Sequence, residues 1–305
     1  MSIEEEINKS IEDQFKKNEH QNLFFQELDY RKQFLEETKE LILKYGEELY
    51  SIDSNQGSGK WVDLMTEKAI RTFWNANQFM DIRKRQIEEL RLIYQLLWKD
   101  ILIEIRAQPI NFDELQKKHL KRLTAWLEKS NAFTKQINKT DQPEIARVIC
   151  AEYSSVLQLQ LLRVDVSVLL QPVLDIGCGE HTYLVTFLRE NGIEAVGLDR
   201  IIEPSAHLIQ ANWLEYSFKP SQWGSVISNH SFTLHFLNHH LRSDGDFISY
   251  AEKYKEILNS LVPGGVFYYA PDLPFIESYL PQDEYKVLNF RINDAFSCTH
   301  IQRLK

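Results

Sequence analysis

Apolar residues along this chain follow one period up to residue 171 and another after it. In the first part they recur every three or four residues, as in Ile3, Ile7 and Ile11, and this spacing is typical of amphipathic helices. In the second part, short apolar runs such as residues 173–176 and 266–270 alternate with helical stretches. That alternation is typical of a parallel sheet with buried strands. The sequence therefore predicts two parts of different structural class.

The first part is predicted to be helical, with breaks where glycine, proline or cap residues occur. Gly46 and the glycine- and serine-rich residues 51–59 predict a loop, and Pro109 ends the next helical region. Asn111 is suited to cap the following helix, and Pro143 to occupy the first turn of another one. The predicted helices cover about residues 3–49, 62–106, 112–129 and 144–162.

Four short apolar runs and a terminal pair of strand-like segments predict the sheet of the second part. The runs are residues 173–176, 194–198, 225–228 and 266–270, and the pair is 285–292 and 295–304 around Asn293-Asp294. We therefore predict an α/β fold: a Rossmann-like doubly wound sheet, mostly parallel, with a C-terminal antiparallel hairpin. A helical domain of residues 1–142 is expected to precede this α/β domain of residues 143–305.

Composition and charge narrow the class of protein. The 305 residues are 43% hydrophobic and 26% charged, which excludes wholesale disorder. The net charge is −9; residues 151–305 contribute −7 and have no general attraction for nucleic acid, whereas residues 51–150 carry +4. Three scattered cysteines, an acidic start and the lack of an apolar run of ~20 residues predict a cytoplasmic protein without disulfides or a membrane segment.

One glycine-rich motif carries the candidate chemistry. In Val173-Leu174-Asp175-Ile176-Gly177-Cys178-Gly179 a strand runs into a tight turn, after which a helix is expected near His181. Asp199, at the end of the next strand, stands where a carboxylate can accept both hydroxyls of a ribose. Asp175 would repel a pyrophosphate, but it suits a ligand with a cationic aminoacyl group. S-adenosylmethionine is such a ligand, because it carries an ammonium and a sulfonium.

At these residues the chain resembles the class I S-adenosylmethionine-dependent methyltransferases. The resemblance covers about residues 143–305, and it includes the Pro263-Gly264-Gly265 turn and the terminal hairpin. It implies that Gly177 and Gly179 line the methionine moiety, that Asp199 binds the ribose, and that residues 211–213 flank the adenine. The cofactor-binding positions implied are Asp175, Gly177, Cys178, Gly179, Asp199, Arg200, Asn212, Trp213 and Asn229. The alternative is a Rossmann-like domain that binds another nucleotide or none.

The chain departs from the family pattern in two places. Only seven residues, including Pro204, separate Asp199 from a predicted third strand at 207–210, so the usual helix has no room there. Asn229-His230-Ser231-Phe232 stands where some members have an Asn/Asp-Pro-Pro-Tyr/Phe signature, and this argues against adenine-N6 or cytosine-N4 as the acceptor.

A histidine cluster follows the fourth predicted strand. His230 ends that strand, where open α/β sheets bind ligands, and it is the first candidate for a general base; His235 is the second. Methyl transfer often needs only positioning and desolvation, so neither has to act as a base. The spacing of His235 and His239 would also allow two metal ligands on one helix face, but no third ligand is evident and we predict no metal.

The remaining features leave the acceptor and the partners open. Residues 57–60 lack the glycine and the Ser/Thr of a phosphate-binding loop, and the basic residues 117–122 read as a solvated helix face. We expect an O or N nucleophile on a small molecule or a peptide or protein, recognised by the helical domain acting as a cap. The alternatives are an RNA methyltransferase and a non-catalytic cofactor-binding scaffold. The helices within residues 1–50 would either form a homodimer or pack on their own chain.

Overall fold

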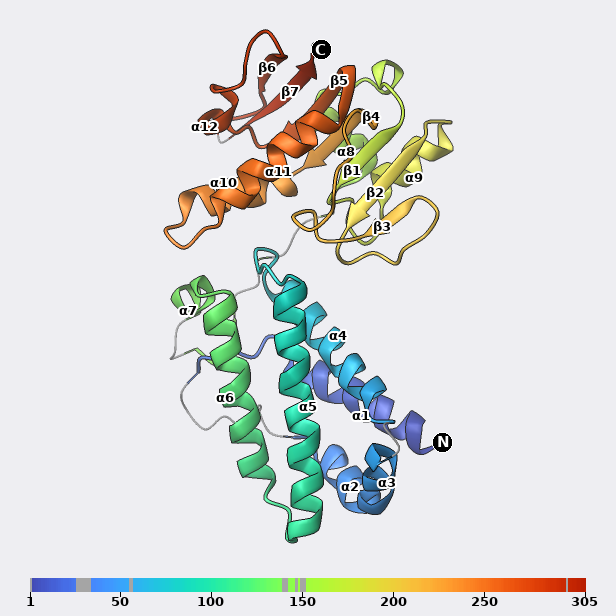
Figure 1. Ribbon diagram of the computed structural model, residues 1–305, viewed down its shortest axis with the longest axis vertical. Coiled ribbons are helices and arrows are strands. Elements are labelled where there is room, and N and C mark those ends of the chain that lie inside the picture. Colours follow the sequence, from blue (N-terminus) through green and yellow to red (C-terminus); the bar gives the residue numbers. More distant parts are fainter. Residues whose placement is uncertain are drawn as a thin grey trace. The chain divides into compact units, whose positions relative to one another are not determined.

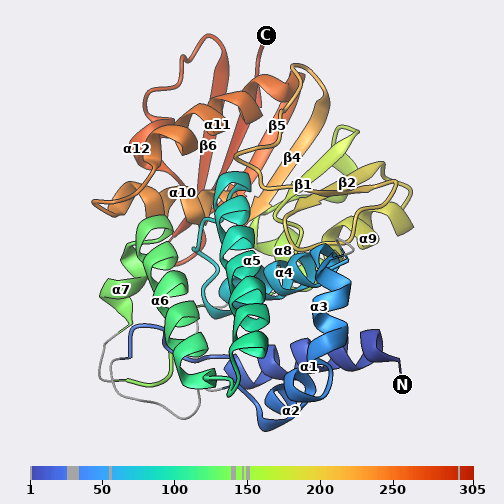
Figure 2. The ribbon, with the colours of Figure 1, turned by 60° about the horizontal axis from the view of Figure 1, so that its bottom comes forward.

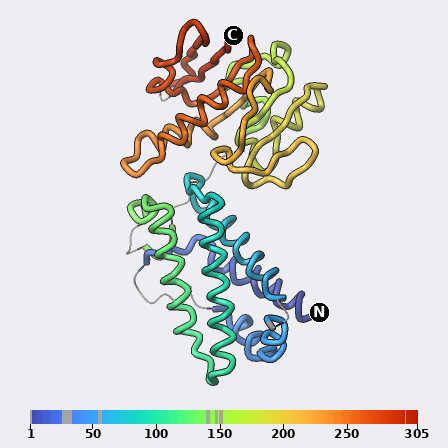
Figure 3. Tube along the Cα trace, viewed as in Figure 1, coloured from blue at the N-terminus to red at the C-terminus, as the bar shows by residue number. Residues whose placement is uncertain are grey.

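The computed structural model describes residues 2–25, 34–54, 57–138, 142–145, 148, 152–294 and 296–305 (Figures 1 and 3). The chain divides into two compact units, Met1–Cys150 and Ala151–Lys305. None of the described helices is long and apolar enough to cross a membrane.

The first unit is helical. Its described helices are α1 (Ile3–Asn18), α2 (Glu36–Lys44), α3 (Gly46–Ser54), α4 (Gly59–Ala76), α5 (Lys84–Ala107), α6 (Phe112–Ser130) and α7 (Phe133–Ile137). One core joins them, and within it the rings of Trp61 and Trp98 stack at 5.5 Å. The apolar stripe of α1, with Ile7 buried, packs into the same core. In this structure the apolar face of α1 is therefore packed within its own unit.

The caps of this unit follow the sequence signals in part. The Asn111 side chain accepts a hydrogen bond from the N–H of Glu114 at 3.1 Å, which confirms the predicted start of α6. Gly46, where a break is predicted, is the first residue of α3, and α3 continues to Ser54 through the first part of the predicted loop 51–59. Leu49 is 3% exposed and packs into the core, and burial of an apolar face stabilises a short helix that propensity alone would not form. The predicted helical region 62–106 is in fact two helices, α4 and α5.

The predicted helix from 144 to 162 is also wrong at its start. The Pro143 carbonyl accepts from the N–H of Asn22 at 2.9 Å, and the N–H of Ile145 donates to His20 at 2.9 Å, so this stretch lies alongside another segment. Such pairing competes with a helix for the same backbone groups. The helix present is α8 (Ser155–Leu161), and the Ser154 side chain caps it.

The second unit is a doubly wound α/β sheet. Its strands are β1 (Val173–Ile176), β2 (Ala195–Asp199), β3 (Leu208–Gln210), β4 (Trp223–Asn229), β5 (Leu261–Ala270), β6 (Tyr285–Arg291) and β7 (Ser297–Arg303), and its other helical elements are η2 (Val166–Val168), α9 (Tyr183–Glu190), α10 (Phe232–Leu241), α11 (Phe247–Ser260) and α12 (Pro274–Glu277). The strand order is β3-β2-β1-β4-β5-β7-β6. Among these strands, β7 pairs antiparallel with β5 and β6, and the other pairings are parallel. This confirms the predicted mostly parallel sheet with a terminal hairpin.

Helices cover both faces of this sheet (Figure 2). Leu174 packs with α10 and α11 on one face, whereas its neighbour Val173 packs with α8 and α9 on the other. Successive strand residues point to opposite faces, so a sheet covered on both sides needs continuous apolar runs. The absence of a helix between β2 and β3, expected from the short spacing, is confirmed.

The topology brings the candidate residues to one edge. β1 lies between β2 and β4, and Asp175 pairs in register with Gly197 of β2 and Ile227 of β4. The carboxyl ends of these three strands therefore meet where the winding of the sheet reverses, which is the usual ligand position in open α/β folds.

Candidate functional site

The first position of the turn after β1 has room only for glycine. Gly177 has φ +78°, and a Cβ there would lie 2.3 Å from the Cβ of Ser231. Gly179 has φ +73°, and its Cβ would lie 2.9 Å from the Glu152 carboxylate. The two glycines therefore allow the backbone to approach neighbouring groups in a conformation that other residues rarely adopt.

Two buried carboxylates lie beside this turn. Asp175 is 2% exposed, and its Oδ2 has no hydrogen-bond partner in the described part of the chain. Burial, reinforced by the nearby Asp199 carboxylate, raises the pKa of Asp175 to about 7. Burial also raises the pKa of Asp199, although backbone N–H groups oppose that shift. A buried carboxyl group without a partner is costly, and a cation would compensate for it.

Asp199 organises the turn from the end of β2. One carboxylate oxygen accepts from the N–H of Gly179 at 3.0 Å, and the other accepts from the N–H of Ile201 at 3.2 Å. Both bonds hold the side chain against the glycine turn. The structure therefore brings Asp199, predicted to bind a ribose, into direct contact with Gly179 of the glycine turn.

The sequence reading missed Glu152. Its carboxylate accepts from the N–H groups of Glu180 at 2.8 Å and His181 at 3.2 Å, just before α9. Both N–H groups belong to the turn that precedes the N-cap of α9, Thr182. Glu152 precedes the first strand by twenty residues, and no local pattern marks it, so only the fold shows this contact.

Ser231 locks the end of β4 to the turn. Its hydroxyl donates to the Ile176 carbonyl, and Ser228 lies 2.8 Å away in position to donate to Ser231. All three groups are buried. This lock explains why a side chain at Gly177 has no room.

The remaining residues predicted to bind the cofactor differ in whether their side chains are available to a ligand at the turn. Trp213 is buried with its ring edge 3.4 Å from where a Gly177 side chain would begin, and the Asn212 side chain accepts from the N–H of Leu214. The Cys178 side chain packs into the core, and its Sγ lies close to Gly197, only 2.7 Å from where a Cβ would be. A ligand at the turn would therefore meet the backbone of Cys178 and not its thiol. Arg200 follows Asp199, and its charge opposes the rise of the Asp199 pKa.

His230 occupies a strained backbone position at the end of β4. Its φ is +51°, and its N–H donates to the Ala270 carbonyl at 2.7 Å. Its Nδ1 lies 2.9 Å from the Oδ1 of Asn229, and in the tautomer in which Nδ1 donates to this oxygen, Nε2 is an acceptor. Burial lowers the His230 pKa, which keeps the ring neutral. Strain of this kind persists where surrounding structure enforces it and is common at functional sites.

The other histidines of the cluster serve packing. His235 is 5% exposed with its ring 4.9 Å from that of Trp213, and burial holds its pKa well below the usual range. His239 accepts from the N–H of Asp246 and stacks on Tyr250, and His240 stacks on Phe275 at 3.8 Å. The structure thus brings His230 to the sheet edge and places His235 in the core. Among the described residues, no group of three or more His, Cys, Asp or Glu side chains could hold a metal.

The sequence matches no protein-family model and no curated protein. Solved structures similar to this chain include a SAM-dependent methyltransferase from Methanosarcina mazei (16% identity, 43% of this chain and 92% of that one, TM-score 0.32). Another is the N-methyltransferase NodS from Bradyrhizobium japonicum (13%, 49% and 96%, TM-score 0.35), which has also been solved in complex with S-adenosyl-L-homocysteine. A third is a SAM-dependent methyltransferase from Archaeoglobus fulgidus (16%, 49% and 94%, TM-score 0.34). The strand order and register of the sheet define the α/β fold of the second unit.

Proposed function

We propose that this protein is a methyltransferase that uses S-adenosylmethionine and transfers its methyl group to an O or N nucleophile. The observation that carries the proposal is the buried Asp175 carboxylate beside the glycine turn, whose Oδ2 finds no hydrogen-bond partner among the residues that the structure describes. A cationic ligand compensates for such a group, whereas a pyrophosphate would be repelled by it. The second carboxylate, Asp199, adds to this preference.

In this proposal, different residues near the turn contact different parts of the cofactor. Asp175 and the backbone of Gly177 and Gly179 would hold the charged aminoacyl end. Asp199 would accept the ribose hydroxyls, and Asn212 and Trp213 would flank the base. When bound, the cofactor supplies an electrophilic methyl group on a sulfonium, and transfer leaves a neutral thioether.

His230 would serve the acceptor. Its neutral ring, with Nε2 free to accept, can take a proton from a hydroxyl or amine nucleophile as the methyl bond forms. His235 is less suited to this role, because its ring lies in the core against Trp213. We propose a small molecule or a peptide or protein side chain as acceptor, because the net −7 of residues 151–305 disfavours nucleic acid.

Titration calorimetry with S-adenosylmethionine and S-adenosylhomocysteine tests the proposal. We expect micromolar binding, about −8 kcal/mol, and its loss in Asp199→Ala. Glu190→Ala is the matched control, because Glu190 is exposed at the far end of α9. His230→Ala should bind the cofactor as the unchanged protein does, while losing turnover once an acceptor is found. No binding of either compound by the full chain would contradict the proposal.

A further inference from the structure

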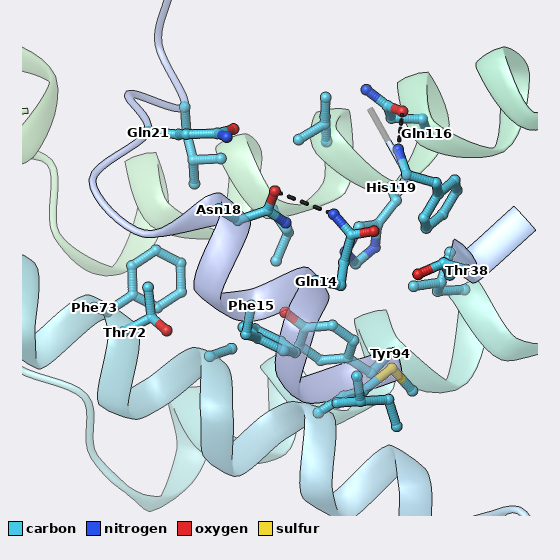
Figure 4. A pocket seen from close by; sticks show the side chains of 18 of the residues that line it. Gln14, Phe15, Asn18, Gln21, Thr38, Thr72, Phe73, Tyr94, Gln116 and His119 are labelled. Atoms are coloured by element: carbon cyan, nitrogen blue, oxygen red, sulfur yellow. Dashed lines mark hydrogen bonds between the residues drawn. The ribbon is translucent and has the colours of Figure 1, made fainter. Parts of the chain in front are cut away.

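The helical unit contains a cavity of about 210 Å³, and the described residues that line it do not include those of the glycine turn. It lies among α1, α2, α4, α5 and α6, and the described residues that line it all belong to the first unit (Figure 4). Its walls are mostly aliphatic and aromatic, with Phe15, Phe73 and Trp98 among them. A cavity of this composition stays dry or takes an apolar ligand.

The described lining has neither carboxylates nor lysine or arginine cations. No Asp, Glu, Lys or Arg is among the described residues that form it. The polar side chains are mostly occupied with one another or with the backbone: Gln14 donates to Asn18 at 3.3 Å, Ser10 and Thr38 lie 2.9 Å apart, and Thr72 donates to the Lys68 carbonyl. A charged ligand would therefore lose its hydration without finding a counter-ion.

Besides the Nε1 of Trp98, two neighbouring polar groups of the lining make no hydrogen bond among the described residues. The Nδ1 of His119 is buried without a partner among the described residues, and the Tyr94 hydroxyl makes no hydrogen bond there either. The two rings are 5.2 Å apart, and Figure 4 shows both next to Gln14. Burial lowers the pKa of His119 to about 4, with the charge of Arg122 acting in the same direction. Both groups are therefore neutral hydrogen-bonding partners.

We propose that the helical unit binds a small, neutral, largely apolar molecule that carries one hydroxyl or N–H group, with Tyr94 and His119 as its polar partners. A cavity of about 150 Å³ holds benzene, so this one fits about eight or nine non-hydrogen atoms. Such a ligand would restore the dispersion contacts that an empty cavity forfeits and would occupy the two unused polar groups. This site is separate from the proposed cofactor site.

A matched pair of probes tests the size and the polarity of the ligand. 4-Ethylphenol and 4-ethyltoluene have the same shape and differ in one hydroxyl. In calorimetric titrations of the full chain, 4-ethylphenol should bind saturably with Kd below about 1 mM, and about fivefold more tightly than 4-ethyltoluene. The anion 4-ethylbenzoate should bind more weakly than either. Saturating S-adenosylhomocysteine should displace neither probe, because the described lining of the cavity comes from the first unit alone.

Three kinds of variant place the binding in this cavity. Tyr94→Phe and His119→Leu should reduce the preference for 4-ethylphenol toward unity while leaving 4-ethyltoluene bound. Tyr45→Phe is the matched control, because its hydroxyl donates to Glu6 outside the cavity, and it should keep the full preference. Ala69→Leu, which fills the cavity from α4, should weaken both probes at least tenfold.

The same measurements can overturn the proposal. It fails if neither neutral probe binds saturably, if the benzoate binds most tightly, or if S-adenosylhomocysteine displaces the probes. It also fails if the preference survives in both Tyr94→Phe and His119→Leu, or if a folded Ala69→Leu protein binds as before. Should Ala69→Leu not fold, the two polar-group variants still decide the question.

Discussion

The Asp199 carboxylate accepts a hydrogen bond from the backbone N–H of Gly179 at 3.0 Å, and this bond joins the end of β2 to the turn after β1. The turn is therefore held in place by a side chain that is itself a candidate ligand for the cofactor. Its neighbour Asp175 has no such donor on Oδ2. The two carboxylates thus have different roles: one is anchored, and the other is available to a cation.

Binding of S-adenosylmethionine should become tighter as the pH rises. Asp175 has a pKa of about 7 in the free protein, so it is mostly protonated at pH 6 and must release its proton when a cation binds. Affinity should fall about tenfold between pH 8 and pH 6 and level off above pH 8. Calorimetry in two buffers of different ionisation enthalpy would measure the released proton. Asp175→Asn should bind weakly without this pH dependence, and a dependence that persists in the variant would contradict the assignment.

Asp175 should make the fold less stable as the pH rises. Its folded-state pKa, about 7, lies above the usual 3.8, so the folded state holds the proton more tightly than the unfolded state. This contribution to the free energy of unfolding is full below pH 4 and is lost as the pH rises through 7. Asp175→Asn, which mimics the protonated form, should therefore gain stability relative to the unchanged protein at pH 8 more than at pH 5. Urea denaturation at both pH values checks the difference, and an equal effect at both would be the contrary result.

Gly177→Ala should be far more damaging than Gly192→Ala. The two glycines have nearly the same φ, +78° and +76°, but a Cβ at Gly177 meets Ser231, whereas nothing lies within 4 Å at Gly192. Backbone strain costs about 1–2 kcal/mol at either position. Overpacking adds about 1–3 kcal/mol at Gly177 alone. Thermal denaturation of both variants isolates the packing term, and equal losses would show that the turn can relax away from Ser231.

Glu152→Ala should destabilise the second unit by about 0.5–1.5 kcal/mol, the usual net contribution of a hydrogen bond to stability. It leaves the N–H groups of Glu180 and His181 without the acceptor that they have now. Glu190→Ala, at the exposed C-terminal end of α9, should change stability little. Chemical denaturation compares the two, and the same small loss in both would mean that water replaces the Glu152 carboxylate without cost.

The sheet could be predicted well because its determinants are local. The run Val173-Leu174-Asp175-Ile176 is β1 from end to end, since a buried parallel strand must be apolar on both faces. The position of Asp199 at the end of β2 could also be predicted, because the apolar run before it marks the strand. The hairpin around Asn293-Asp294 was marked by its turn residues.

The failures share a different cause, namely contacts between residues far apart in the sequence. Residues 142–145 carry a good helix-start signal, but their backbone groups are taken by residues 20–22. Glu152 reaches the turn, and His235 turns into the core against Trp213, for reasons that no local pattern contains. The strained φ of His230 likewise depends on the Ala270 carbonyl, which belongs to another strand.

Glu152 sets a limit on how the second unit can be excised. A fragment that began at Ser155, where its first helix starts, would keep every strand and yet lack the carboxylate that holds the N–H groups of Glu180 and His181. Such a fragment would contain the whole sheet with a loosened glycine turn. Expression boundaries drawn from secondary structure alone would therefore separate the turn from one of its own supports.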